Sequence, residues 1–356
     1  MSKRVAIVGA GVLGAAIAWR LGQTGARVRL FDPTPGGLAS PGSFAWLNAS
    51  MPEDPVYNRL RHDSLELWRQ MKDADPSVPI EFAGALLWEQ EHFDLDSIAD
   101  SHTELGRPYE WLDRETITAR EPAVKQSPEK AYLAAGDGYG DPEEITGWFL
   151  EQAGAAGAEL VEIDVDSIDV QGGRVTGLTT AGGHEPFDHV IVAAGTALPK
   201  LLAPLGVGIE MDNQPGLLAR TSPGAGRISA MLAAPNVHVW QGADGSYLFG
   251  ADFGGGSAIE DPREVAAAVL RELQALLKGT ESCEIENITV RERPMPVDGR
   301  PAIGPLGPGG LYVVCTHSGM TLAPVIAEMV AREVGTGQDD PRLGSYRPDR
   351  DSLRLE

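Results

Sequence analysis

The chain has 356 residues, enough for about two domains. Its 29 basic and 51 acidic residues give a formal net charge of −22, which disfavours nucleic-acid and membrane-surface partners, and no run of Lys and Arg occurs. The cysteines, Cys283 and Cys315, are too few for a disulfide framework and lack zinc-site spacing. We therefore expect a cytoplasmic protein with reduced thiols and no metal site.

A glycine-rich turn joins the first predicted strand to the first predicted helix. Residues 4–9 form a short apolar run that predicts a buried strand, and residues 12–23 predict a helix. Between them, Gly9-x-Gly11-x-x-Gly14 permits a tight turn, close approach of the backbone to a pyrophosphate, and close packing of the helix on the strand. The longer uncharged run Val5–Trp19 also resembles a signal peptide, but the glycine spacing favours a strand, turn and helix.

The second predicted strand, residues 26–32, ends in an acidic residue. A carboxylate at Asp32 can accept hydrogen bonds from a ribose 2′-hydroxyl and would repel a 2′-phosphate. FAD and NAD proteins share this fingerprint, so it does not decide between them. The alternation of strands and helices stops at about residue 50 and resumes near residue 187.

The remaining elements suggest two interleaved domains. Helices are predicted over residues 55–73, 143–157, 262–277 and 320–334. Strands are predicted over residues 80–88, 159–164, 167–170, 175–180, 187–193, 237–241, 247–249 and 311–315. Strand–helix units therefore occur at both ends of the chain, and a region typical of antiparallel strands fills the middle.

Four segments, in order, resemble the FAD-dependent D-amino-acid oxidase superfamily, which includes glycine oxidase, sarcosine oxidase and D-amino-acid dehydrogenase. The first is the glycine loop itself. The others are residues 40–49, a small-residue loop similar to the one that passes the flavin, residues 188–195, similar to a second strand ending in glycine, and residues 293–324, the most specific match.

The resemblance implies an α/β fold in which a Rossmann-type FAD-binding domain is interleaved with an α+β substrate domain on a mostly antiparallel sheet. The FAD-binding domain would comprise residues 1–80, 141–208 and 290–356. The substrate domain would comprise residues 81–140 and 209–289.

The resemblance also implies FAD, held non-covalently because Cys315 is not at an attachment position; we expect it to be a buried free thiol. The helix starting at Met320 would direct its N–H groups at the flavin and stabilise the charge that grows there on reduction. The expected cofactor-binding residues are Gly9, Gly11, Val12, Leu13, Gly14, Asp32, Ser43, Phe44, Ala45, Val165, Ala194, Gly195, Gly319, Met320 and Thr321.

Four residues are expected at the substrate. The resemblance places Arg293 where relatives hold an Arg that pairs with the substrate carboxylate, as a guanidinium fork does well, although an ordinary surface Arg remains the alternative. His317 would lie near the flavin or would only cap the helix. Trp46 and Tyr247 would line the substrate cavity or would belong to the core.

The implied reaction is oxidation of a C–N single bond in an amino acid or N-substituted amine to an imine, by hydride transfer to flavin N5. The partners would be that small molecule and O2 or another electron acceptor. Residues 245–250 lack the Lys that sarcosine-oxidase relatives use with oxygen, so oxidase and dehydrogenase both stay open. A third alternative is a flavin-carrying subunit of a heteromeric complex.

Overall fold

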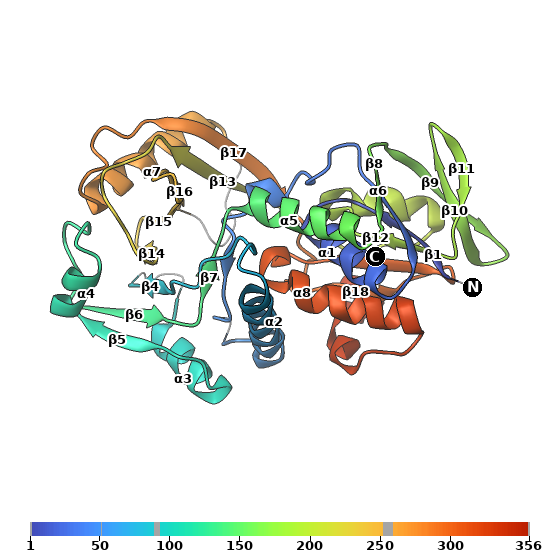
Figure 1. Ribbon diagram of the computed structural model, residues 1–356, viewed down its shortest axis with the longest axis horizontal. Coiled ribbons are helices and arrows are strands. Elements are labelled where there is room, and N and C mark those ends of the chain that lie inside the picture. The colour runs from blue at the N-terminus through green and yellow to red at the C-terminus, as the bar shows by residue number, and fades with distance from the viewer. Residues whose placement is uncertain (1, 51, 89–92, 252–258, 355–356) are drawn as a thin grey trace. The chain divides into compact units, whose positions relative to one another are not determined.

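The computed structural model describes residues 2–50, 52–88, 93–251 and 259–354 (Figure 1). The chain forms two compact units. The first unit is built from Met1–Pro41, Glu143–Gln214 and Glu292–Glu356, and the second from Gly42–Pro142 and Pro215–Arg291. Each unit therefore draws on separate stretches of the sequence.

Residues 42–80 differ from the predicted domain boundaries. We placed them in the FAD-binding domain, but they group with the second compact unit. The physical reason is strand pairing, because β3 (Trp46–Leu47) pairs with β7 (Gly138–Tyr139) in that unit. The other compact-unit boundaries lie within a few residues of the predicted ones.

A six-stranded sheet with the order β18-β19-β12-β1-β2-β8 forms the centre of the first unit. All neighbouring pairs are parallel except β18 with β19. The strands are β1 (Arg4–Val8), β2 (Arg27–Phe31), β8 (Glu159–Val161), β12 (His189–Val192), β18 (Ala302–Pro305) and β19 (Leu311–Cys315). Because parallel strands share one direction, the carboxyl ends of β1, β2, β12 and β19 lie along one edge of the sheet.

Two helices that begin at this edge pack against each other. Helix α1 (Val12–Gln23) follows β1, and helix α8 (Gly319–Val330) follows β19. The predicted helix over 320–334 is confirmed, although it changes to a π-helix over Ala331–Thr336. Nearly every residue of α8 is buried, as expected for an apolar helix between packed layers.

Other elements complete the first unit. Helix α5 (Pro142–Ala155) confirms the prediction over 143–157, and α6 (Leu198–Leu202) follows β12. A separate antiparallel sheet contains β9 (Val165–Gln171), β10 (Arg174–Thr180) and β11 (Gly183–Pro186).

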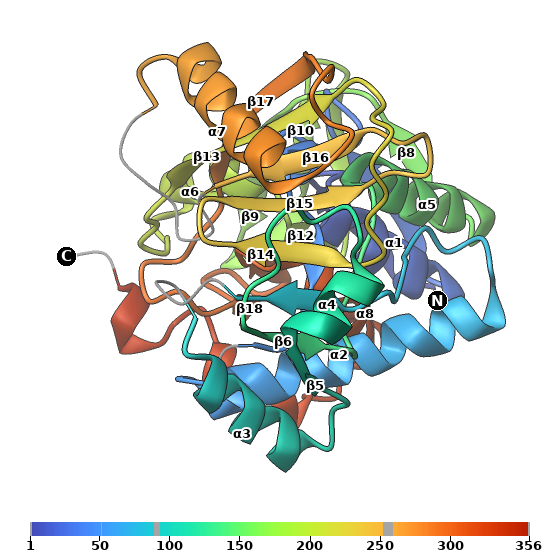
Figure 2. The ribbon, with the colours of Figure 1, turned by 90° about the vertical axis from the view of Figure 1, so that its left-hand side faces the viewer.

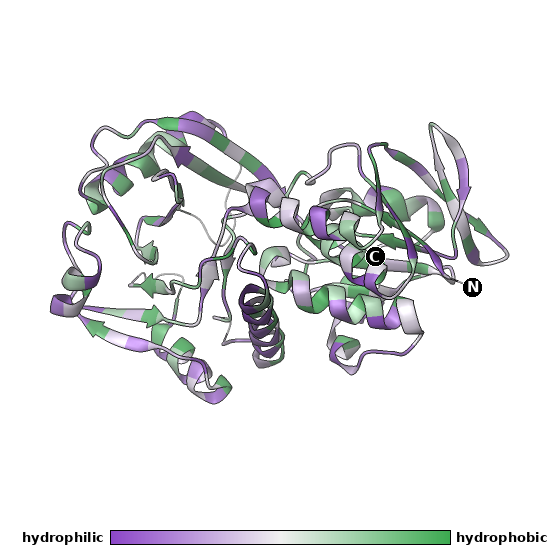
Figure 3. Cartoon of the chain, in the orientation of Figure 1, coloured by the Kyte–Doolittle hydropathy of each residue, from purple (hydrophilic) through white to green (hydrophobic). Residues whose placement is uncertain are grey.

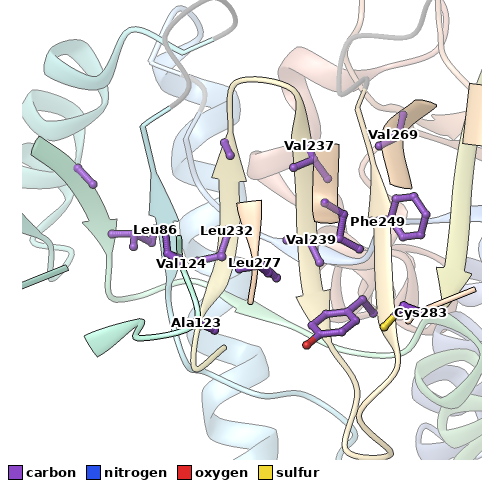
Figure 4. Packing of buried hydrophobic residues seen from close by; sticks show 14 of the residues in the cluster. Leu86, Ala123, Val124, Leu232, Val237, Val239, Phe249, Val269, Leu277 and Cys283 are labelled. Atoms are coloured by element: carbon purple, nitrogen blue, oxygen red, sulfur yellow. The ribbon is translucent and has the colours of Figure 1, made fainter. Parts of the chain in front are cut away.

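The second unit contains an eight-stranded, mostly antiparallel sheet with the order β17-β13-β16-β15-β14-β4-β6-β5. The strands are β4 (Ala85–Leu87), β5 (Glu110–Asp113), β6 (Lys130–Ala134), β13 (Gln214–Thr221), β14 (Met231–Ala234), β15 (Val237–Gln241), β16 (Tyr247–Gly250) and β17 (Ile285–Arg293). Helix α7 (Pro262–Leu276) packs on β15 and β16 (Figure 2). One apolar cluster fills the space under α7 and includes Phe249, Val269 and Cys283 (Figure 4).

Capping residues explain where the helices of the second unit begin. Helix α2 (Pro55–Ala74) starts with Pro55 after Asp54, whose side chain accepts a hydrogen bond from Tyr57 N at 3.0 Å. Sequence reasoning missed two shorter helices, α3 (Leu95–Leu105) and α4 (Arg114–Arg120), although an Asp caps each of them.

The hydropathy colouring distinguishes helix α2 from helix α8. Helix α2 is mostly hydrophilic and α8 mostly apolar (Figures 1 and 3), in keeping with the partly exposed surface of α2 and the burial of α8. Within the described residues, no helix combines the length and apolarity that a bilayer crossing requires.

A partly buried ion pair fastens the C-terminal segment to the rest of the first unit. Arg350 donates from Nε and Nη2 to the two carboxylate oxygens of Asp298 at 2.7 and 2.8 Å, and Ser352 Oγ donates at 2.6 Å. Burial alone would raise the pKa of Asp298, but these donors outweigh it and lower the pKa to about 2.

We expect Asp298→Asn to lower the free energy of unfolding by about 2 kcal/mol at pH 7, since one pKa unit corresponds to about 1.4 kcal/mol. The folded-state pKa is lowered, so the stabilisation is complete above the unfolded-state pKa of about 3.9 and is lost as the pH falls toward the folded-state value. Urea unfolding of both proteins at pH 7, 4 and 3 measures this. A difference that does not shrink toward pH 3 would contradict the assignment.

Candidate functional site

The glycines after β1 are required by close contacts between backbones. Gly9 has φ +105°, and a Cβ there would lie 2.4 Å from the carbonyl oxygen of Ala193, at the end of β12. A Cβ at Gly14 would lie 1.8 Å from the carbonyl oxygen of Gly9. No side chain fits at either place, so the loop holds the start of α1 tightly against the ends of two strands.

The amino end of α1 provides donors for an anion. Its first-turn N–H groups have no carbonyl partner within the helix, and the helix dipole makes this end positive. Gly11 caps the helix without a side chain, and Ser40 Oγ accepts from Val12 N at 3.1 Å. Leu13 and Gly14 belong to the same turn. This arrangement suits a pyrophosphate.

Asp32 also shapes the glycine loop. Its Oδ2 accepts a hydrogen bond from Ala10 N at 2.6 Å, and its Oδ1 accepts one from Thr34 N at 2.8 Å. Burial raises the pKa of Asp32 despite these two donors, and the charge of Asp164 raises it further. Each carboxylate oxygen has a second lone pair, so the side chain can still accept a ribose hydroxyl. Sequence reasoning identified the acid but not its bond to the loop.

The amino ends of α1 and α8 lie side by side. A Cβ at Gly319 would lie 3.3 Å from Val12 Cγ1 and 3.6 Å from Leu13 Cγ. Met320 and Thr321 are buried in the first turn of α8. Two positive helix ends therefore face the same edge of the sheet, which is where ligands bind in open α/β sheets.

The structure brings Arg293 and His317 to the same edge. A Cβ at Gly195, which has φ +55° and follows Ala194, would lie 3.8 Å from Pro294 Cβ. Cys315 Sγ is 3.8 Å from the carbonyl oxygen of Pro294. Arg293, next to Pro294, is half-buried, and His317, just after β19, is exposed.

Two predicted residues of the first unit lie in its core. Cys315 is a buried free thiol, as expected, and burial raises its pKa to about 12. Val165, at the start of β9, packs in one apolar cluster with Phe31, the residue before Asp32.

The predicted loop residues Ser43, Phe44 and Ala45 belong to the second unit, where β13–β16 and β3–β7 also lie. Ser43 Oγ accepts from Ala45 N at 3.0 Å, and Trp240 Nε1 donates to the carbonyl oxygen of Phe44 at 2.9 Å. Ala45 has φ +53°, a left-handed conformation that costs a non-glycine residue about 1–2 kcal/mol. Such strain is concentrated at functional sites.

Trp46 and Tyr247 lie on different faces of the eight-stranded sheet. Trp46 packs with Trp240 and Leu248 on one face. Tyr247 points to the other face, into the core under α7, and its hydroxyl donates to the carbonyl oxygen of Gly226 at 2.7 Å. Tyr247 is fully buried, so its assignment to the substrate cavity is corrected to a core role. Alternation of side chains along β16 separates it from Leu248.

An ion pair beside Trp46 was missed from the sequence. Trp46 Nε1 donates to Asp137 Oδ2 at 3.0 Å, and Arg107 Nη2 donates to Asp137 Oδ1 at 2.7 Å. Burial raises the pKa of Asp137 to about 6, against the lowering effect of the Arg107 charge. The one local signal is that Asp137 stands between two glycines, Gly136 and Gly138.

Known proteins resemble this chain along most of its length. The family model for FAD-dependent oxidoreductases matches residues 4–333. A D-amino acid dehydrogenase of Rhodopseudomonas palustris is 26% identical, with 90% of this chain and 91% of that protein covered. A glycine oxidase of Pseudomonas aeruginosa is also 26% identical, with 93% and 94% covered. The solved glycine oxidase of Bacillus cereus has a TM-score of 0.86 at 21% identity, covering 99% of this chain and 100% of its own.

We expect Gly14→Ala to weaken FAD binding at least about tenfold, a loss of about 1.4 kcal/mol, because the new Cβ must displace the Gly9 carbonyl and the first turn of α1. FAD titration of the apoprotein measures this. The control is Gly147→Ala in α5, where a Cβ meets nothing within 4 Å and Ala favours the helix. Wild-type FAD affinity in Gly14→Ala would contradict the assignment of the loop.

Proposed function

The chain belongs to the family of FAD-dependent oxidoreductases, and we propose that it oxidises the C–N single bond of an amino acid or N-substituted amine to an imine. The family match and the two relatives named above indicate an FAD-dependent oxidoreductase that acts on amino acids or amines. The observation that supports the finer proposal is the edge of the six-stranded sheet in the first unit, where two helix amino ends lie near Asp32 and near Pro294, the residue after Arg293. FAD, when bound, supplies the acceptor for the hydride.

The residues of this edge fit the parts of the cofactor. The α1 amides would hold the pyrophosphate and Asp32 a ribose. The α8 amino end, with Gly319, Met320 and Thr321, would face the flavin. The other proposed contacts are Gly9, Gly11, Ser43, Phe44, Ala45, Val165, Ala194 and Gly195. Both free cysteines are buried, which supports a non-covalent cofactor.

The substrate would be oriented by side chains rather than activated by a strong base. Arg293 would pair with a substrate carboxylate through its planar guanidinium. His317 and Trp46 would border the substrate, Trp46 as an apolar wall. A substrate bound as the neutral amine needs no further proton removal before its hydride is transferred.

The proposal also covers the electron acceptor, the kind of substrate and the cellular location. O2 or another acceptor must reoxidise the enzyme, and the two relatives named above differ in whether their name is oxidase or dehydrogenase. The net charge of −22 supports a small-molecule substrate over a polyanion. The two free thiols support a cytoplasmic location.

We expect the flavin absorption band of the FAD-loaded protein to bleach under anaerobic conditions with at least one substrate from a panel. The panel comprises D-amino acids, N-methyl amino acids, cyclic imino acids and plain amines. Peroxide released in air with the active substrate identifies an oxidase, and its absence identifies a dehydrogenase. A band that persists with every compound would overturn the proposed enzymatic function and favour a flavin-carrying subunit.

We expect Arg293→Met to raise KM about 10- to 100-fold for carboxylated substrates, since hydrogen bonds to a charged group contribute about 1.5–3 kcal/mol. Steady-state kinetics measure it, and plain amines should show no such change. The matched control is Arg291→Met, an exposed arginine two positions earlier, which should leave KM unchanged. An unchanged KM in Arg293→Met would remove Arg293 from the substrate site.

A further inference from the structure

The loop Ser43–Trp46 has a backbone shape that its own residues do not favour. Among the described residues, Ala45 is the single non-glycine with positive φ, and it is buried. A residue in this conformation persists only where its surroundings hold it. The contacts of its neighbours therefore show what maintains the shape of the loop.

Three contacts hold the loop on the aromatic face of the eight-stranded sheet. Trp240 Nε1 holds the Phe44 carbonyl, and the Trp240 ring stacks on Tyr139 with centroids 5.4 Å apart. Trp46 pairs with Tyr139 through β3 and β7. The third contact is from Trp46 Nε1 to Asp137 Oδ2 at 3.0 Å. The residues on both sides of Ala45 are thus each held by a contact of their own.

Asp137 and Arg107 form a buried ion pair. Their side chains are 0% and 2% exposed, and the Nη2–Oδ1 distance is 2.7 Å. Gly136 leaves room for the guanidinium, because a Cβ there would lie 3.0 Å from Arg107 Nη2. The Asp137 backbone is fixed as well, since its carbonyl oxygen accepts from Gly84 N at 3.1 Å. Both oxygens of this carboxylate are therefore held at fixed positions.

The pair is a poor device for stability alone. Burying two charges carries a desolvation cost that an ion pair often only balances, and apolar residues of similar size often serve as well. Arg107 Nε adds to the cost, because it is buried and has no hydrogen-bond partner among the described residues. An acceptor fixed for the Trp46 indole is a benefit that apolar residues could not supply.

We propose that the Asp137–Arg107 pair is a positioning device for amine oxidation, which holds the loop Ser43–Trp46 in place with Ala45 in its left-handed conformation. Asp137 accepts the indole N–H, and Arg107 fixes the direction of the carboxylate. The inference rests on the proposed function, in which this loop contributes Ser43, Phe44, Ala45 and Trp46 to the site. Neither Asp137 nor Arg107 touches substrate in this proposal.

The test compares two buried acids of the second unit. Asp137→Asn keeps the size of the side chain but removes the charge that balances Arg107. The control is Glu121→Gln, since Glu121 is 2% exposed and accepts hydrogen bonds from Ser229 N and Ala230 N at 3.0 and 3.1 Å, two residues outside the loop. Each variant should lower the melting temperature, so stability alone does not distinguish them.

Asp137→Asn should shift the visible flavin band of the FAD-loaded protein and lower kcat/KM at least tenfold for the best substrate. Glu121→Gln should leave the band in place and change kcat/KM less than twofold. If the two variants lose the same stability and neither moves the flavin band, the positioning role is overturned.

A second variant covers the case in which Asp137→Asn does not fold. Trp46→Phe keeps an aromatic ring but removes the N–H donor, and it should shift the same band in the same direction. An unchanged band and unchanged kcat/KM in Trp46→Phe would overturn the proposal. The band needs no substrate, so a wild-type protein that oxidises no amine would refute the proposed function while still leaving the positioning role measurable.

Discussion

The contact between Gly14 and the carbonyl of Gly9 is the constraint on which the first unit depends. The Gly14–Gly9 contact sets the distance between the start of α1 and the end of β1. The contact of Gly9 with Ala193 sets the distance between the ends of β1 and β12. With that spacing fixed, the start of α8 can reach Val12 and Leu13. The positive ends of the α1 and α8 dipoles then lie side by side at the sheet edge, where their potentials add.

The same edge could be anticipated from the sequence because its signals are local. Glycine spacing, a short apolar run and an acid at the end of the next strand each reflect contacts between near neighbours in the chain. Helices α8 and α2 were predictable from the helical spacing of their apolar residues. The bond from Asp32 to Ala10 was not, because the motif specifies the residue type and not its second partner.

The second unit depends on contacts between distant parts of the chain, which a single sequence does not reveal. Tyr247 and Leu248 are adjacent, yet only pairing with neighbouring strands decides which of them faces α7. Residues 42–80 group with the second unit for a similar reason, since β3 pairs with β7 about ninety residues later in the chain. Asp137 and Arg107 carry no motif at all, and only the folded chain brings them to Trp46.

An acidic chain that binds an anionic cofactor must obtain its positive potential from the backbone. With a net charge of −22, the many surrounding acids would compete with a pyrophosphate for any basic side chain placed near it. Acidic side chains cannot turn the helix amides away from a pyrophosphate, because the fold fixes the direction of these N–H groups. In the proposed FAD site the glycines would serve electrostatics as well as packing, since the absence of side chains would allow the phosphates to reach those amides.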